Sequence, residues 1–213
     1  MYLTPRQLLL GGATGLTGEY LLDRLLSEPT VQRVLAPSRR PLPEHPRLDN
    51  PVGALEYLLP ALQGPVETVF CCLGARQQSG SPPPQLEEVD LELVLAFARR
   101  ARILGARHLL VVSARGASLD STCPWLQAKG RMEQALQQQG WPQLTIARPP
   151  RLLGPRYSQR LLDRLMAPLA GLLPGSPLGL EVCALVWALW RLALEEDQGL
   201  RIVEADELRR LGE

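Results

Sequence analysis

The sequence predicts an α/β fold, in which a doubly wound, mostly parallel sheet carries helices on both faces and a small helix-rich C-terminal portion. Short apolar runs alternate with longer stretches of helical spacing, which is typical of successive strand–helix units. A glycine-rich turn joins the first apolar run, residues 7–10, to a helical stretch that ends near Leu26. The 213 residues are enough to bury one sizeable core.

Composition narrows the class of protein. Hydrophobic residues make up 46% of the chain and the formal net charge is +1, so neither disorder nor nucleic-acid binding is indicated. The N-terminus lacks a signal-peptide pattern, and prolines and charges interrupt the apolar stretch 161–194, so we expect a cytoplasmic protein without a membrane span. The four cysteines lack metal-ligand spacing. We expect all four to be small core residues and no metal site, with a reactive Cys123 as the alternative.

The first strand, turn and helix carry the clearest signal. Gly12, Gly15 and Gly18 follow the strand at the spacing GxxGxxG and open the helix. Glycine allows positive φ and lets the backbone approach a pyrophosphate, and the helix N-terminus offers unpaired N–H groups to that anion. We therefore predict a dinucleotide-binding, Rossmann-like unit, with a ligand-free glycine turn as the alternative. The other loop residues expected at the cofactor are Thr14, Leu16 and Thr17.

The end of the second strand indicates which dinucleotide binds. This strand is expected at residues 33–36, and Arg39 and Arg40 follow it with no carboxylate close behind. In dinucleotide folds this position meets the adenosine ribose, where an acidic residue binds the 2′-hydroxyl and arginine suits a 2′-phosphate. The pattern favours NADP(H), with NAD(H) as the alternative.

The third strand is weakly marked. It is expected within residues 47–52, where Asp49 or Asn50 is placed to hydrogen-bond the adenine amino group. Residues 53–63 then repeat leucine at helical spacing, which predicts a helix.

A continuous apolar run over residues 68–73 is typical of a central parallel strand. It ends at the carboxyl edge of the sheet, where open α/β sheets bind ligands. Leu73, Gly74 and Ala75 are therefore expected beside the cofactor. The loop 76–85 has no periodicity, and it is interpreted either as a flap over the site or as a surface loop.

The alternation continues to residue 150. Helices are expected at 86–104 and 126–139, and strands at 108–112 and 144–147. A glycine follows each of the two helices, as at many helix ends. We place an NAD(P)-binding domain at residues 1–150 and treat residues 151–213 as a helix-rich portion packed on it, on the substrate side.

The C-terminal portion is expected to hold helices at 157–173, 180–196 and 206–211 and a short strand at 200–203. Trp187 and Trp190 lie three residues apart, so we place them on one helix face. Core packing is the expected role of both, with a subunit or substrate surface as the alternative.

Two polar residues accompany the central strands. Ser113 follows the strand at 108–112, and Lys129, the one lysine among 23 Lys and Arg residues, lies early in the next helix. Both are expected to point towards the nicotinamide.

With these residues in place, the chain resembles the short-chain dehydrogenase/reductase superfamily, in particular the atypical branch that includes the Tat-interacting-protein-like oxidoreductases. The resembling segments are GATGLTG at 12–18, CCLGA at 71–75, VVSARGAS at 111–118, WLQAKGRMEQAL at 125–136 and ARPPRLLGPR at 147–156.

The resemblance implies a role for each matching residue. The three glycines match the family's phosphate loop, and Arg39 and Arg40 match basic residues that bind the 2′-phosphate. Ser113 matches the serine that hydrogen-bonds the substrate carbonyl oxygen. Lys129 matches the lysine of the YxxxK motif, which holds the nicotinamide ribose hydroxyls and lowers the tyrosine pKa. Pro149 matches a residue whose neighbouring backbone contacts the carboxamide.

The chain departs from the family pattern at Trp125. The tyrosine of YxxxK, which donates a proton to the carbonyl oxygen, should stand there. An indole N–H donates a hydrogen bond but is not a usable acid, so water, Ser113 or another phenol would have to deliver the proton. Tyr157 is the candidate phenol. Trp125 itself either packs over the nicotinamide or a flat substrate, or only caps the helix entrance as buried bulk.

Two functions stay open on the sequence alone. One is an NADP-dependent reductase of the atypical type, with an altered proton donor, acting on a small carbonyl or enone substrate. The other is a catalytically silent NADP(H)-binding sensor or scaffold that acts through partners. We expect a small-molecule substrate or an unidentified protein partner, no nucleic acid, and a monomer or homodimer.

Overall fold

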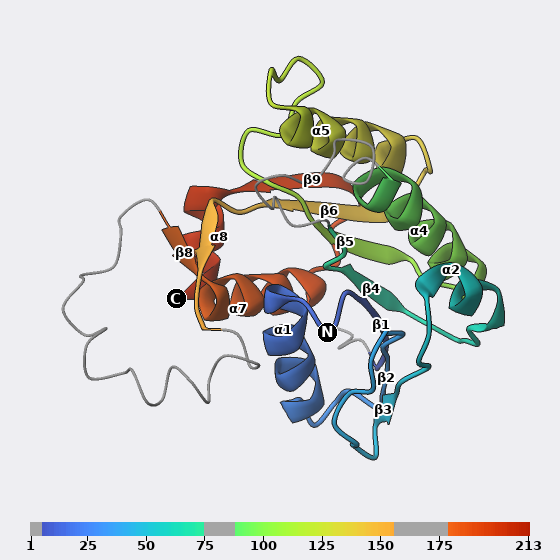
Figure 1. The fold of residues 1–213 in the computed structure, drawn as a ribbon. Helices are drawn as coiled ribbons and strands as arrows, with labels where there is room; N and C mark the ends of the chain where they lie inside the picture. The colour runs from blue at the N-terminus through green and yellow to red at the C-terminus, as the bar shows by residue number, and fades with distance from the viewer. Residues whose placement is uncertain (1–5, 75–87, 156–178) are drawn as a thin grey trace.

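The computed structural model describes residues 6–74, 88–155 and 179–213. Its main sheet has seven parallel strands in the order β3-β2-β1-β4-β5-β6-β9 (Figure 1). The predicted doubly wound parallel sheet is therefore confirmed. The strands are β1 (Gln7–Gly11), β2 (Arg33–Leu35), β3 (Leu48–Asp49), β4 (Thr68–Cys71), β5 (His108–Val112), β6 (Gln143–Arg148) and β9 (Gly199–Glu204).

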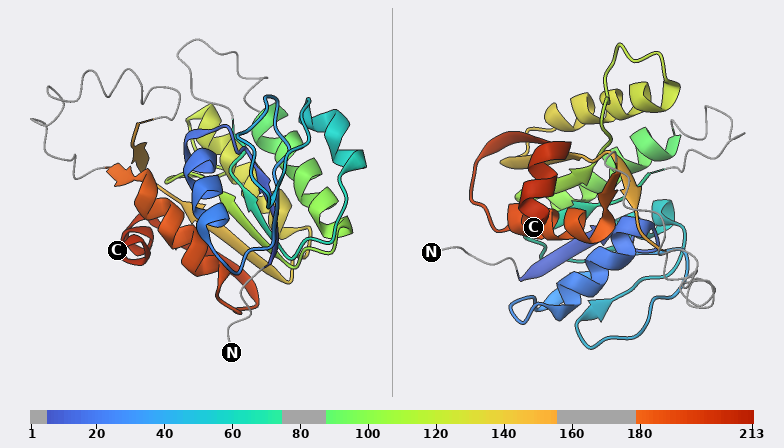
Figure 2. Two further views of the ribbon diagram at one scale, coloured as in Figure 1. Left: turned by 90° about the horizontal axis from the view of Figure 1, so that it is seen from below. Right: turned by 90° about the vertical axis from the view of Figure 1, so that its left-hand side faces the viewer.

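Helices cover both faces of this sheet (Figures 1 and 2). One face packs against α1 (Leu16–Ser27), α7 (Val182–Ala193) and α8 (Ala205–Gly212). The other packs against α2 (Leu55–Leu58), the 3₁₀ turn η1 (Leu59–Ala61), α4 (Val94–Ile103) and α5 (Pro124–Gln137), with the π-helical turn η2 (Glu88–Leu93) leading into α4. The central strands are buried on both faces, which explains their continuous apolar runs.

The strand order reverses between β1 and β4. The chain runs outward from β1 to β2 and β3, then returns to place β4 on the other side of β1. Gly11 at the end of β1 is level with Cys71 at the end of β4. In open parallel sheets, ligands bind beyond the carboxyl ends of the strands at such a reversal. The glycine turn predicted to bind a diphosphate lies at this point.

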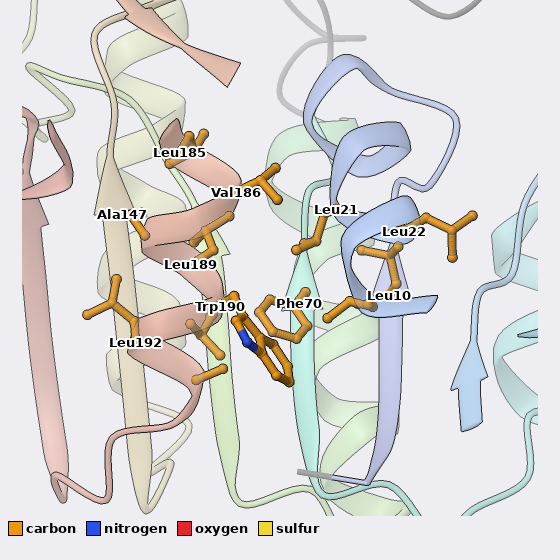
Figure 3. Packing of buried hydrophobic residues seen from close by; sticks show 14 of the residues in the cluster. Leu10, Leu21, Leu22, Phe70, Ala147, Leu185, Val186, Leu189, Trp190 and Leu192 are labelled. Carbon is orange, nitrogen blue, oxygen red and sulfur yellow. The ribbon is translucent and has the colours of Figure 1, made fainter. Parts of the chain in front are cut away.

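The two tryptophans of α7 do not share an environment. Trp190 is 4% exposed and lies beside Phe70 of β4 in the core (Figure 3). Trp187 is 42% exposed, and the guanidinium of Arg24 stacks 3.8 Å from its ring centroid. The prediction that both pack in the core is wrong for Trp187: residues three apart on an α-helix still differ in direction by about 60°, and Trp187 lies at the edge of the buried stripe. Of the four cysteines predicted in the core, Cys71 is buried and Cys72 and Cys123 are half-buried, but the prediction is wrong for Cys183 on this helix, which is exposed.

Two predicted elements differ in extent. The helix expected over residues 53–63 is reduced to α2 and η1, because Pro60 has no N–H to continue the α-helical ladder. The start of the helix expected at 180–196 is instead β8 (Gly179–Glu181), which pairs in parallel with β7 (Arg151–Leu153) in a separate two-stranded sheet. The expected loop at 76–85 and the expected helix at 157–173 lie outside the described residues.

The last part of the chain completes the main sheet. β9 pairs with β6 over six residues, from Gln143–Gly199 to Arg148–Glu204. Residues beyond 150 therefore supply both an edge strand and two of the covering helices. Among the described residues, no helix has the length and apolarity needed to cross a bilayer.

Candidate functional site

The glycine turn after β1 is folded too tightly for side chains at two positions. Gly12 has φ +81°, and a Cβ there would stand 2.5 Å from the carbonyl oxygen of Cys72, just beyond β4. A Cβ on Gly18 would overlap the carbonyl oxygen of Gly12. Only glycine allows the turn to fit between the end of β4 and the first turn of α1.

The third glycine leaves the start of α1 open. Gly15 is the N-cap residue, and no side chain caps the helix there. The N–H of Gly15 donates to the Gly12 carbonyl oxygen at 2.9 Å, which orders the turn. The first N–H groups of a helix have no intrahelical acceptor and face an anion favourably. The turn and these open N–H groups form a cradle that fits a diphosphate. Of the other predicted contacts, Thr14 and Leu16 are half-buried and Thr17 is buried.

The predicted 2′-phosphate residues lie in a hydrogen-bonded loop, residues 36–42, which we call the arginine loop. Arg39 and Arg40 are exposed, and neither has an ion-pair partner among the described residues. The side chain of Asn50, predicted to bond adenine, here bonds the arginine loop: Nδ2 donates to the Ala36 carbonyl oxygen at 2.6 Å, and Oδ1 accepts from the Leu42 N–H at 2.9 Å. The adenine contact stays a prediction.

The end of β4 borders the same crevice. Leu73 is half-buried and Gly74 is exposed, directly beyond the glycine turn. Cys72 lies against this turn, and burial, with a smaller contribution from Cys71, raises the pKa of its thiol. Cys72 therefore stays a neutral thiol at neutral pH. Ala75, the third residue predicted here, lies outside the described residues.

Ser113 is bound to a buried carboxylate. It directly follows β5, is 6% exposed, and donates its hydroxyl to Glu133 of α5. Glu133 is 2% exposed and also accepts from Arg148, at 3.1 Å from Nε and 2.5 Å from Nη2. Arg148 gives Nη1 to Glu204 at 3.0 Å. The hydrogen bonds that Arg148 donates to Glu133 raise the pKa of the Arg148 guanidinium, which therefore stays charged.

This network fixes the direction of the Ser113 hydroxyl. A serine has one proton, and an ion-paired carboxylate can only accept. Ser113 therefore commits its proton to Glu133 and presents lone pairs to any other neighbour. Donation from Ser113 to a substrate oxygen would require this hydrogen bond to break.

Two predicted site residues and one further residue form a row on α5. Trp125, Lys129 and Glu133 are four residues apart, so they lie on one face of the helix. Glu133 shows that this face is turned towards the carboxyl ends of β5 and β6. Lys129 is 4% exposed. The indole Nε1 of Trp125 is buried and has no hydrogen-bond partner among the described residues. This row therefore starts with an N–H donor that has no partner among the described residues and ends at Glu133, which bonds the Ser113 hydroxyl just after β5.

Two predicted site residues remain, Pro149 and Tyr157. Pro149 follows β6, is buried, and accepts the Arg115 N–H on its carbonyl at 3.0 Å, which ties the segment after Ser113 to the segment after β6. Tyr157, the candidate phenol, lies outside the described residues. Sequence reasoning missed Glu133 and Arg148. Their signal is present, since Glu133 continues the spacing of Trp125 and Lys129 by one more turn.

Comparisons with known proteins identify relatives of the chain by sequence. No family model matches the chain. Protein HTATIP2 of Rattus norvegicus is 32% identical over 173 residues, which cover 78% of this chain and 70% of that protein. Protein FMP52, mitochondrial, of Candida glabrata is 29% identical over 149 residues, covering 68% and 63%. The chain thus spans about two-thirds of the length of these relatives.

Solved structures share the fold. MoeE5 in complex with UDP-glucuronic acid and NAD aligns with a TM-score of 0.72 at 21% identity, covering 93% of this chain and 75% of that one. WbmF of Bordetella bronchiseptica in complex with NAD+ and UDP aligns with a TM-score of 0.72 at 17% identity, covering 93% and 71%. At these identities the likeness concerns the fold alone.

Proposed function

Because the chain belongs to the atypical, NAD(P)-binding branch of the short-chain dehydrogenase/reductase family with HTATIP2 and FMP52, we propose that it is an NADP(H)-dependent oxidoreductase that acts on a small carbonyl or enone substrate. One observation carries the proposal: an uncapped glycine cradle opens α1 at the strand reversal, and the loop after the neighbouring β2 holds two arginines without an ion-pair partner among the described residues. The cradle fits a diphosphate, and the arginines fit one further phosphate beside it.

Different residues of the crevice would hold different parts of the cofactor. The amides at the start of α1 would hold the diphosphate, and Arg39 and Arg40 would pair with the 2′-phosphate. Lys129, on the row that faces the ends of β5 and β6, would hold the nicotinamide ribose. When bound, the nicotinamide supplies or accepts a hydride. The protein's own task is then to place the substrate oxygen and to provide a route for its proton.

We propose water as the source of that proton, with Tyr157, which lies outside the described residues, as the alternative. The Trp125 N–H has no partner in the part of the chain that the structure describes and would donate to a substrate oxygen, but an indole does not release its proton. Ser113 is committed to Glu133. We therefore place Trp125 as the residue that holds the substrate oxygen and water as the proton source, and we expect a slower reaction than a tyrosine would give, by a factor of about 10²–10⁴.

Calorimetry and turnover together test the proposal. NADPH is expected to bind more tightly than NADH, and to be consumed with at least one member of a carbonyl and enone library. Trp125→Tyr should raise the rate, and the matched Trp125→Phe, which keeps an aromatic ring but removes the N–H, should lower it. Absence of binding by both cofactors rejects the proposal. Tight binding with no consumption over hours rejects the reductase and leaves the silent sensor or scaffold.

The cellular setting is a smaller part of the proposal. We propose a cytoplasmic protein, acting as a monomer or homodimer on a small molecule. Cell fractionation tests the location. Recovery in the mitochondrial fraction, the location printed in the names of the fungal relatives, would contradict the cytoplasmic part of the proposal.

A further inference from the structure

We propose that Asn50 sets the preference for the 2′-phosphate without touching it, by holding the arginine loop in the shape that presents Arg39 and Arg40. The inference rests on the proposed NADP(H) preference. It differs from the adenine contact predicted from the sequence, because it gives Asn50 a positioning role towards one phosphate rather than a binding role towards the shared adenosine.

Three hydrogen bonds fix the Asn50 amide in one orientation. Nδ2 donates to the Ala36 carbonyl at 2.6 Å and to Ser38 Oγ at 2.8 Å. Oδ1 accepts from the Leu42 N–H at 2.9 Å. The reversed amide would set an NH₂ group against the Leu42 N–H and an oxygen against the Ala36 oxygen, so only the observed orientation satisfies both. The side chain thus joins the start and the end of the arginine loop.

The outer half of the loop depends on this side chain. Backbone bonds tie only the inner part: the Ala36 N–H donates to the Asp49 oxygen at 2.8 Å and the Ser38 N–H to the Pro51 oxygen at 3.0 Å. Beyond Ser38, the hydrogen bonds of the described loop are that of Leu42 to Asn50 and that of Ser38 Oγ to the Arg40 oxygen at 2.6 Å. Since Ser38 Oγ itself accepts from Asn50, both hydrogen bonds depend on the same amide.

The surrounding charges leave the two arginines available. Asp49, the acidic neighbour of Asn50, is ion-paired with Arg33. Its charge is therefore offset, and it neither occupies Arg39 or Arg40 nor strongly repels a phosphate. A loop held in place before binding loses less conformational freedom when the phosphate arrives, which increases affinity for that group. NADH lacks the phosphate and should gain nothing from the loop.

The test measures the ratio of NADPH to NADH affinity by calorimetry in four proteins: wild type, Asn50→Ala, the double variant Arg39→Ala/Arg40→Ala, and the triple variant. Asn50→Ala is expected to weaken NADPH about tenfold and to change NADH by less than about threefold. In the background without the two arginines, Asn50→Ala should leave the ratio unchanged, since its effect passes through them.

A matched control separates this effect from general loosening. Gln143→Ala removes another amide that bonds a backbone carbonyl, that of Glu195 at 2.9 Å, at the amino end of β6 and away from the crevice. Its affinity ratio should equal that of the wild type. If Asn50→Ala does not fold, Ser38→Ala removes the bond to the Arg40 oxygen and the bond from Asn50 Nδ2, keeps the other two bonds of Asn50, and tests the same dependence on the loop.

The outcomes are distinct. A wild type that does not prefer NADPH contradicts the proposed cofactor, whatever Asn50 does. A wild type that prefers NADPH, with an unchanged ratio in Asn50→Ala, overturns the role of Asn50 alone. Equal weakening of both cofactors by Asn50→Ala also overturns it, and indicates instead a contact with the adenosine that both cofactors share.

Discussion

At the scale of single residues, Glu133 organises the polar edge of the site. Its buried carboxylate receives Ser113 from β5 and Arg148 from β6. Taking a carboxylate out of water is costly unless its oxygens are fully paired, and here the Arg148 guanidinium and the Ser113 hydroxyl supply the partners. The ends of two strands and one helix are therefore held together by one side chain, and the orientation of the Ser113 hydroxyl is a consequence of that structural role.

Replacing Glu133 should therefore lower stability. Glu133→Gln leaves Glu204 as the one carboxylate that Arg148 bonds among the described residues and gives Ser113 a partner that also donates, so we expect a loss of about 2–3 kcal/mol in the free energy of unfolding. The control is Glu204→Gln, because the Glu204 side chain is 56% exposed and should contribute less than about 1 kcal/mol. Urea unfolding measures both. Equal losses would contradict a special role for the buried carboxylate.

His108 predicts a pH dependence of stability. It is 4% exposed, its Nε2 lies 2.9 Å from Thr145 Oγ1, and burial lowers its pKa from 6.5 to about 3. His108 of the unfolded chain thus becomes protonated near pH 6.5, whereas His108 of the folded chain stays neutral until about pH 3. The stability from neutral His108 is complete above pH 6.5 and is lost as the pH falls towards 3, by at most about 1.4 kcal/mol per pH unit.

The measurement compares wild type with His108→Gln in unfolding titrations between pH 7 and pH 4.5. Carboxylates titrate in both proteins, so the difference between the two curves isolates the histidine. Wild type should lose stability more steeply below pH 6.5. Parallel curves would show that His108 is protonated, or is reached by water, in the folded state.

At the scale of elements, two substitutions in the turn between β1 and α1 should distinguish an effect on stability from an effect on cofactor binding. Gly18→Ala would overlap the Gly12 carbonyl oxygen and should lower both the melting temperature and cofactor affinity. Gly15 has φ −85° and ψ 169°, which alanine adopts, and an added Cβ would stand 3.3 Å from that oxygen. Gly15→Ala should therefore keep stability within about 1 kcal/mol and still weaken NADPH by about tenfold or more, because the methyl fills the cradle.

Calorimetry and thermal unfolding on the same two variants check this. The wild type is the reference for both measurements. A Gly15→Ala protein that binds NADPH like the wild type would show that the diphosphate does not lie at the start of α1.

Elements with a local signal could be predicted from the sequence. The apolar runs at 7–10 and 108–112 lie within β1 and β5, and the helix expected at 206–211 lies within α8. The strand pair β7–β8 could not be predicted, because each strand has three residues and its partner lies far along the chain. The site follows the same rule: the glycine turn is a local motif, whereas Glu133 and Arg148 meet only when α5 packs on β6.

At the scale of the whole molecule, residues from the first and the last parts of the chain pack in one core. The core on the α1 side draws residues from both ends: Leu10 and Leu21 pack in one cluster with Leu189 of α7, Val203 of β9 and Leu208 of α8. Several of these side chains are fully buried. The sheet is therefore finished, and one of its faces covered, by residues that lie after the last strand of the nucleotide-binding half.

This arrangement predicts that residues 1–155 do not fold as a stable unit. Without the C-terminal part, β6 loses its pairing with β9, and the apolar side chains under α7 are exposed to water. We expect the shortened chain to lack the cooperative thermal transition of the full chain, followed by circular dichroism, and to show no NADPH-dependent shift. A shortened chain that unfolds cooperatively and binds NADPH like the full chain would show instead that the first 155 residues form an independent domain. The C-terminal residues would then only cover it, and the core shared by the two ends of the chain would contribute little to holding the cofactor crevice together.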